Sequence, residues 1–338
     1  MTLPAPAFFD SASASRVFRV AYDEHAREAK AWAAEHGVSP AASDRSRTAL
    51  LLVDVQNTFC VPGYELFVGG RSGRGAVEDS SRVASFLYGH LAQITQVVVT
   101  LDTHTAVQIF HPVFWVDEAG EHPSPHTVLS LEDIEAGRWR VNPHVAAAVA
   151  PRPGFDVEAW ARHYVGRLHQ GGKYPLVVWP YHAMVGGTGH ALVSIVEEAV
   201  FFHSIARQSA TRVEVKGRNP LTEHYSVLHP EVIEDAAGER IGTINIALID
   251  HLLSFDAVIV AGQAKSHCVA WTVEDLLEEI RTRDPALARR IFLLDDCSSA
   301  VVVPGVADFT DPAEEAYRRF AAAGMHRVVS TTPMEDWD

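Results

Sequence analysis

The sequence predicts an α/β fold in which a doubly wound, Rossmann-like parallel sheet carries helices on both faces. The first observation behind this prediction is a series of continuous apolar, partly β-branched runs of strand length, as in parallel strands buried on both faces. The second is that segments with apolar residues at helical spacing stand between these runs. Such alternation is typical of a parallel sheet.

The elements follow in chain order. Residues 1–46 are expected to form an N-terminal helical extension, with a helix over 16–36 that ends before Gly37-Val-Ser-Pro40. The main domain would comprise residues 47–338. Its expected strands cover 48–55, 96–101, 176–182, 211–216, 257–261, 290–296 and 327–330. Its expected helices cover 76–94, 193–208, 244–253, 269–283 and 314–323.

Residues 112–175 interrupt this alternation and are interpreted as an insertion. They are rich in Pro, His and Trp, and we expect at most one or two helices in them, at 143–150 and 157–168. The insertion would cover the face of the sheet that carries the polar residues described below. Its aromatic residues are expected to form a small core of their own: Phe114, Trp115, Trp139 and Trp160.

Composition limits the class of protein. Of 338 residues, 47% are hydrophobic and 21% are charged, as in ordinary globular proteins. The formal net charge of −15 argues against nucleic acid or an anionic membrane surface as partner. The 3 cysteines are too scattered for a disulfide framework, and no run has the length of a signal peptide core or a membrane span. We therefore expect a cytoplasmic protein that binds neither nucleic acid nor membrane.

Polar side chains stand at the ends of several expected strands. Asp54 ends the first strand, Asp102 and His104 end the second, and Lys216 ends the strand over 211–216. Ligands of open α/β sheets bind outside the carboxyl ends of the strands. These residues are therefore candidates for a functional site, although Asp54 taken alone could also cap a helix or anchor a loop.

Cys268 lies where the strand over 257–261 passes into the helix over 269–283. The free N–H groups and the dipole at a helix N-terminus stabilise an anion, so we expect the pKa of this thiol to be lowered. Cys268 is thus a candidate nucleophile, with a buried structural cysteine as the alternative. Cys297 is expected to be structural.

The candidate residues fall into two chemical groups. Cys268, Asp54 and Lys216 would supply a thiol nucleophile, a carboxylate base and a cation that favours the thiolate. Asp102 and His104 form an Asp-x-His pair whose side chains point the same way in extended backbone. Together with His182, from the turn after the apolar stretch that begins at Leu176, they suggest a metal site with one oxygen and two nitrogen ligands and open positions.

With these residues placed, the sequence resembles the nicotinamidase/pyrazinamidase branch of the isochorismatase-like cysteine hydrolases. The matching segments follow the family's order and cover most of residues 47–330. They are Leu51-Leu-Val-Asp-Val-Gln-Asn-Thr-Phe-Cys60, Leu101-Asp-Thr-His104, Trp179-Pro-Tyr-His182, Val215-Lys-Gly217 with Glu223-His-Tyr-Ser226, and Gly262-Gln-Ala-Lys-Ser-His-Cys-Val269.

The resemblance implies an isochorismatase-like fold and a cysteine amidohydrolase that converts nicotinamide, or a similar small carboxamide, to its acid and ammonia. Cys268 would form a thioester, Asp54 would act as general base and then acid, and Lys216 would be the third catalytic residue. A non-proline cis peptide bond is expected at Gln263–Ala264. It would let the N–H groups of Ala264 and Cys268 form an oxyanion hole.

The resemblance also implies a divalent metal, expected to be Zn²⁺, that holds the pyridine nitrogen of the substrate. Its ligands would be Asp102, His104 and His182. His111 is a candidate for a further ligand, and Phe59 and Trp179 match the aromatics that enclose the substrate ring. The partner is then a small-molecule amide, and we expect a homo-oligomer.

Several departures from the family pattern bear on the substrate. Lys265-Ser266 stands where the family usually has Thr-Asp, and Ala183 replaces a common Cys. A related cysteine amidohydrolase acting on another small amide or carbamoyl compound is therefore an alternative. A catalytically silent binding protein is a further alternative, disfavoured by the intact Cys268, Asp54 and Lys216. An isochorismatase is disfavoured because its vinyl-ether chemistry does not need a cysteine nucleophile.

Overall fold

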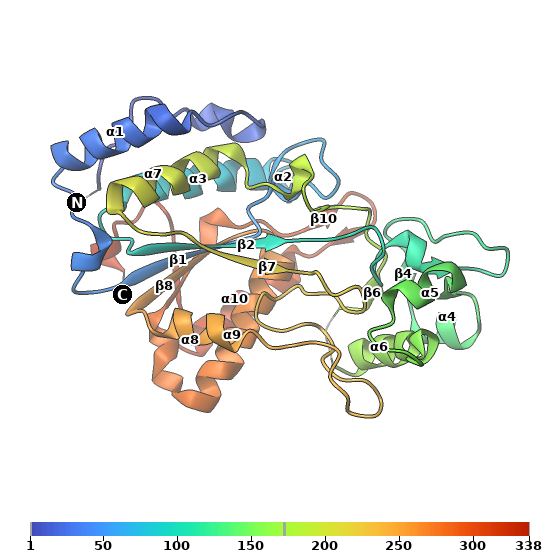
Figure 1. The fold of residues 1–338 in the computed structure, drawn as a ribbon. Coiled ribbons are helices and arrows are strands. Elements are labelled where there is room, and N and C mark those ends of the chain that lie inside the picture. Colours follow the sequence, from blue (N-terminus) through green and yellow to red (C-terminus); the bar gives the residue numbers. More distant parts are fainter. Residues whose placement is uncertain (1, 172–173, 338) are drawn as a thin grey trace.

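A six-stranded parallel sheet in the order β12-β9-β8-β1-β2-β7 forms the centre of the molecule (Figure 1). The fold is known from a computed structural model that describes residues 2–171 and 174–337, so residues 172 and 173 of the predicted insertion lie outside the described part, as do residues 1 and 338. All strand pairs of this sheet are parallel, which confirms the predicted α/β class. The strands are β1 Thr48–Val53, β2 Gln96–Asp102, β7 Arg212–Lys216, β8 Ala257–Gly262, β9 Ile291–Leu294 and β12 His326–Val328.

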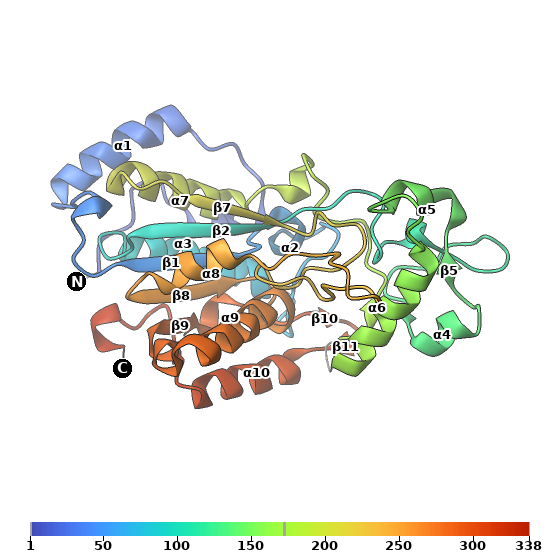
Figure 2. The same ribbon diagram turned by 60° about the horizontal axis from the view of Figure 1, so that its bottom comes forward.

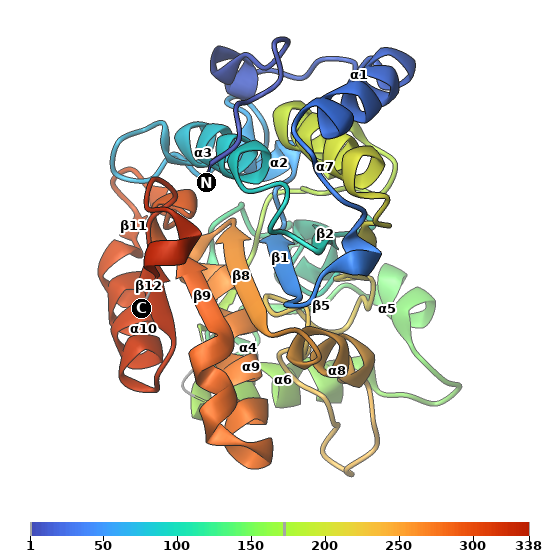
Figure 3. The same cartoon turned by 90° about the vertical axis from the view of Figure 1, so that its left-hand side faces the viewer.

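Helices cover both faces of the sheet, as Figures 1 and 3 show. Leu50 and Leu52 of β1 belong to the core beneath the helices of one face, whereas Leu51 and Val53 belong to the core of the opposite face. This division follows from the period of two along a strand. The helices of the first face are α3 Gly75–Gly89 and α7 Ser194–Arg207, and those of the second are α8 Ile246–Leu253, α9 Ala270–Arg283 and α10 Thr310–Ala322.

The N-terminal segment packs on the outside of α7 (Figure 3). The helix expected over 16–36 is shorter, α1 Tyr22–Glu35, and follows a 3₁₀ turn η1 at Ser11–Ser15. Trp32 of α1 is buried against Phe202 of α7, with the ring centroids 5.6 Å apart. The segment therefore extends the core of its own chain.

Residues 112–171 and 174–175 form a separate layer at the end of the sheet toward which β2 points (Figures 1 and 2). Phe114, Trp115 and Trp160 are buried together and Trp139 packs against them, which confirms the predicted aromatic core. A third helix in this segment, Leu131–Glu135, was not expected. A capping box at Ser130 marks its start. The elements are η3 Pro112–Phe114, β3 Trp115–Val116, β4 Val128–Leu129, α4 Leu131–Glu135, β5 Arg140–Val141, α5 Pro143–Val149 and α6 Val157–Gly171.

The strand expected over 176–182 is wrong in its extent and its partner. Only β6, Leu176–Val177, is a strand, and it pairs antiparallel with β4 of the insertion instead of joining the main sheet. Leu176, Val178 and Trp179 are apolar because they complete the core of the insertion. Burial in a second core therefore gives the same run of apolar residues in the sequence as burial in the central sheet.

The other expected elements are confirmed, with shifts of a few residues at their ends. No helix in the described part of the chain has the length and apolar character needed to cross a membrane. The remaining short elements are η2 Ala41–Ser43, α2 Asn57–Cys60, η4 Thr188–His190, the π-helical turn η5 Lys265–Val269, η6 Pro285–Arg290, η7 Asp295–Cys297, β10 Val302–Val303, β11 Ala307–Asp308 and η8 Met334–Asp336.

Candidate active site

The turn that carries Cys268 begins at the end of β8. Gly262 has φ +127°, and a Cβ there would lie 2.0 Å from the carbonyl oxygen of Val53 on the neighbouring strand, so only glycine fits. The peptide bond Gln263–Ala264 is cis, as the resemblance implied. The π-helical turn η5 follows and presents Cys268 just before α9.

Predicted residues from different strand ends meet at Lys216. Lys216 Nζ lies 2.8 Å from Asp54 Oδ2, 2.9 Å from Asp102 Oδ1 and 3.6 Å from Cys268 Sγ. It also donates to the backbone oxygen of His224 at 2.7 Å. The structure therefore brings the predicted nucleophile, base and cation into one contact group.

Asp54 is held rigidly at the end of β1. Its backbone has φ +48°, a left-handed conformation that costs a non-glycine residue on the order of 1–3 kcal/mol. The Asp54 N–H donates to Thr100 Oγ1 at 3.0 Å, and the same hydroxyl donates to Asp54 Oδ1. Thr100 thus fixes the carboxylate from β2 and leaves Oδ2 toward Lys216.

Burial and neighbouring charges together set the pKa values in this group. It raises the pKa of Asp54, and the nearby Lys216 charge offsets that rise only in part. Burial also opposes the ionisation of Asp102, but the charges of His104 and Lys216 hold the pKa of Asp102 well below its usual range. Although burial opposes its charge too, Lys216 faces Asp102 and Asp54, which raise its pKa well above the ordinary value.

The expected lowering of the Cys268 pKa is wrong. Burial raises the pKa of this thiol well above its usual range, and the Lys216 charge offsets the rise only in part. A hydrogen bond to Asp54 raises it further. A thiol that keeps its proton in this environment needs a base beside it, and Asp54 occupies that position.

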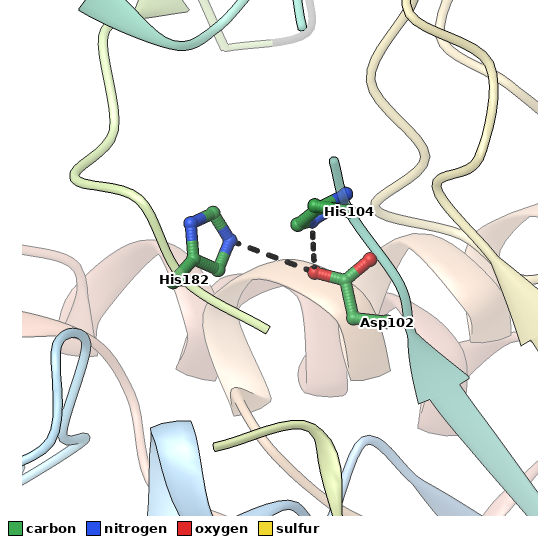
Figure 4. A group of neighbouring side chains, drawn as sticks. All are labelled: Asp102, His104 and His182. Carbon is green, nitrogen blue, oxygen red and sulfur yellow. Dashed lines mark hydrogen bonds and ion pairs between the residues drawn. The ribbon is translucent and has the colours of Figure 1, made fainter. Parts of the chain in front are cut away.

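Asp102, His104 and His182 form a cluster whose possible ligand atoms all lie within 4.8 Å of one another. The Nδ1 atoms of His104 and His182 donate to the backbone oxygens of Gly217 and Pro180, at 3.1 and 2.8 Å. In the neutral rings each Nε2 then carries a lone pair, and both Nε2 atoms face Asp102 Oδ2, at 2.8 and 3.6 Å (Figure 4). Three acceptor atoms that converge in this way fit a divalent metal ion.

His111, the candidate for a further ligand, lies beside this cluster. Its ring centroid is 5.8 Å from those of both His104 and His182. Its Nε2 is buried and has no hydrogen-bond partner among the described residues. A fourth ligand role for His111 stays a prediction.

A cavity of about 300 Å³ opens above these groups. Cys268 and Ala264 line it, and so do the predicted aromatic residues Phe59 and Trp179. Asp54 and Lys216 are buried beneath the lining, with 0% and 4% exposure. The Asp-His-His cluster lines the same cavity: Asp102, His104 and His182.

Glu223 also lines this cavity, and the sequence reasoning assigned it no role. Trp179 Nε1 donates to Glu223 Oε1 at 3.0 Å and to the Tyr225 hydroxyl at 3.1 Å. Burial raises the pKa of Glu223 to about 8. Its only signal in the sequence was its place in the segment Glu223-His-Tyr-Ser226.

Lys265, which departs from the family pattern, is buried behind the nucleophile turn. Its Nζ lies 2.6 Å from Asp295 Oδ1, contacts Glu314, and stands 4.4 Å from the centroid of the Tyr317 ring. Its backbone N–H donates to Ser299 at 2.8 Å. Lys265 therefore ties the turn to α10 and to the end of β9, away from the cavity.

The fold and the site together define an α/β protein with a buried Cys-Asp-Lys group beside an Asp-His-His cluster. No family model and no curated protein matches the sequence. Solved structures match the fold. An Acinetobacter baumanii nicotinamidase/pyrazinamidase is 18% identical with a TM-score of 0.51, and the match covers 86% of this chain and 99% of that one.

The yeast nicotinamidase Pnc1p, bound to the inhibitor nicotinaldehyde, gives a similar result. It is 17% identical with a TM-score of 0.51, and the match covers 83% of this chain and 99% of that one. At these identities the likeness concerns the fold. The expected isochorismatase-like fold is confirmed.

Proposed function

We propose that this protein is a cysteine amidohydrolase that hydrolyses a small carboxamide, with nicotinamide as the first candidate substrate. The observation that carries the proposal is the position of Lys216 Nζ, in contact with Asp54, Asp102 and the Cys268 thiol at the floor of a cavity. The likeness to two nicotinamidase structures supports the same reaction class. The proposed hydrolase domain comprises residues 47–338, with residues 1–46 as an extension on α7.

In the proposed mechanism, Asp54 accepts the thiol proton while the Lys216 charge stabilises the forming thiolate. Cys268 Sγ attacks the carboxamide carbon, and the N–H groups of Ala264 and Cys268 bind the developing oxyanion. The C–N bond then breaks, and the leaving nitrogen takes the proton from Asp54 and departs as ammonia. The acyl group remains on Cys268 as a thioester.

The second half of the reaction uses the same groups in the same order. Asp54 takes a proton from a water molecule, which attacks the thioester carbon. The C–S bond breaks, the carboxylic acid leaves, and the proton returns from Asp54 to the Cys268 sulfur. The raised pKa of Asp54 suits this role, because a base works best when its pKa approaches the working pH.

A divalent metal would be held by Asp102, His104 and His182, and Zn²⁺ suits this set of oxygen and nitrogen ligands. When bound, the ion would supply Lewis acidity that anchors a basic atom of the substrate, such as a ring nitrogen. Phe59 and Trp179 would then enclose an aromatic ring in the same cavity. The proposed setting is a reducing cytoplasm, since Cys60, Cys268 and Cys297 are all free thiols.

A second substrate class is another small amide or carbamoyl compound. One observation favours it: residues 112–175 contribute His126 to the cavity lining, so the insertion takes part in shaping the cavity. Polar groups at the cavity wall, Glu223 and Tyr225, could bind a substituent that nicotinamide lacks. The reaction would be unchanged and only the acyl part of the substrate would differ.

Ammonia release from purified, Zn²⁺-loaded protein tests the proposal. Nicotinamide, pyrazinamide and N-carbamoyl amino acids are compared, with Cys268→Ala and chelator-treated protein as controls. Turnover of nicotinamide supports the first substrate. Turnover of a carbamoyl compound alone supports the second class, and no turnover of any amide by metal-loaded wild type contradicts the proposed function.

A further inference from the structure

β7 forms one edge of the central sheet, and that edge is open. Among the residues that the structure describes, β7 has β2 as its neighbour on one side and no strand on the other. Figure 1 shows β7 at the front of the sheet, between the layers of α7 and α8. An uncovered edge strand offers unpaired N–H and C=O groups to another strand.

The backbone of β7 shows which groups face outward. The N–H of Thr103, the residue after β2, donates to the backbone oxygen of Lys216 at 3.0 Å. Since the direction of these groups alternates along a strand, Arg212 and Glu214 also face β2, whereas Val213 and Val215 face away from it. Outside the β2–β7 ladder, no backbone hydrogen bond in the described part of the chain uses Val213 or Val215.

The side chains of β7 also divide into two faces. Val213 and Val215 point to one face and are 54% and 46% exposed, which is unusual for two apolar residues of one strand. Arg212 and Glu214 point to the other face, where Arg212 Nε lies 2.6 Å from Glu214 Oε1. The edge thus combines an apolar face with one basic and one acidic residue.

We propose that β7 pairs antiparallel with β7 of a second copy of this chain, around a two-fold axis at Val213. In this register the outward groups of Val213 meet those of Val213 in the second copy, and the outward groups of Val215 meet Thr211. Arg212 stands opposite Glu214 of the second copy, and Glu214 stands opposite Arg212. Opposite charges in directly opposed positions stabilise a strand pair, whereas like charges destabilise it.

The charge order makes the edge complementary to itself, which is why the partner is a second copy. A two-fold pairing uses the same strand of both chains, so the open edge disappears from the assembly. The valines of both copies then form one continuous apolar stripe on the same side of the joined sheet. A register centred on Val215 is excluded, because Gly217 would have to be extended and has φ +79°.

Molecular mass in solution tests this inference, and the result does not depend on the proposed reaction. Light scattering after size-exclusion chromatography of the full chain, over a concentration series, is expected to show twice the 37.0 kDa of one chain. Val213→Lys would place two lysines at the axis and is expected to give monomer. Val213→Thr is the matched control and is expected to remain dimeric, because threonine also favours strands.

Charge reversal provides a second, independent readout. Glu214→Arg places like charges opposite each other and is expected to give monomer, while the double variant Arg212→Glu/Glu214→Arg restores the complementary order and the dimer. Circular dichroism checks that each variant is folded. A wild type that stays monomeric over the whole series, a folded Val213→Lys dimer, or a folded double variant that is monomeric would each overturn the inference.

Discussion

Lys216 Nζ lies 2.8 Å from Asp54 Oδ2 and 3.6 Å from Cys268 Sγ, so one buried cation contacts both the base and the thiol of the candidate active site. The same nitrogen contacts Asp102 of the Asp-His-His cluster. The Cys-Asp-Lys group and the Asp-His-His cluster therefore share the Lys216 charge. A substitution in one of them is expected to change the electrostatic environment of the other.

Lys216→Met should abolish activity and lower the free energy of unfolding. The substitution leaves Asp54 and Asp102 buried without their cation, an imbalance that costs roughly 3–5 kcal/mol in buried pairs. We expect kcat to fall by at least about a thousandfold, as when a member of a catalytic group is removed. Urea unfolding and ammonia release measure the two effects. Unchanged turnover in a folded variant would exclude Lys216 from catalysis.

Glu223→Gln should change how stability depends on pH. The folded-state pKa of Glu223 is raised to about 8 from an ordinary value of 4.5. Its contribution to the free energy of unfolding is therefore fully present below pH 4.5 and is lost as pH rises toward 8. Between these two pH values the free energy of unfolding of the wild type should fall by about 1.4 kcal/mol per pH unit relative to that of the variant.

Urea unfolding of wild type and Glu223→Gln at several pH values between 5 and about 8 checks this prediction. The two stabilities should be most alike at the acid end, where wild-type Glu223 is protonated like the amide of Gln. Parallel pH profiles for the two proteins would show that the Glu223 pKa is not raised in the folded state.

His182→Ala should lower metal affinity, and His111→Ala tests whether His111 is the predicted further ligand. Nε2 of His182 faces Asp102 Oδ2 together with that of His104, whereas the His111 ring lies 5.8 Å from both histidine rings. Loss of a ligand should weaken Zn²⁺ binding by more than the 10–100-fold typical of outer-shell changes. Competition with a chelating dye measures the affinity, and an equal loss in His111→Ala would make His111 a ligand.

Lys265→Met should lower kcat by a larger factor than it changes KM, because Lys265 positions the nucleophile turn and does not reach the cavity. Its ammonium group contacts Asp295 and Glu314, as does the Arg327 guanidinium, but only Lys265 belongs to the turn. Arg327→Met is therefore a matched control that should lower stability with little effect on kcat. A greater loss of kcat in Arg327→Met would contradict a positioning role for Lys265.

The sequence predicted the sheet and which candidate residues would lie together, because both depend on local patterns. Asp54 follows β1, Asp102 ends β2 and Lys216 ends β7, and parallel strands bring their carboxyl ends to one edge. The extent of the strand at 176–182 was wrong because apolar runs do not tell which core buries them. The raised pKa of Cys268 and the partners of Glu223 depend on burial between distant segments, which spacing along the chain does not encode.

The central claim is that Cys268 carries the acyl group of the substrate. Rapid acid quenching of metal-loaded protein mixed with nicotinamide, followed by intact-mass measurement, tests it most directly. The account predicts a species heavier by the acyl group in wild type, with the adduct on Cys268, and neither adduct nor ammonia in Cys268→Ala. Ammonia release by Cys268→Ala at the wild-type rate would contradict the account.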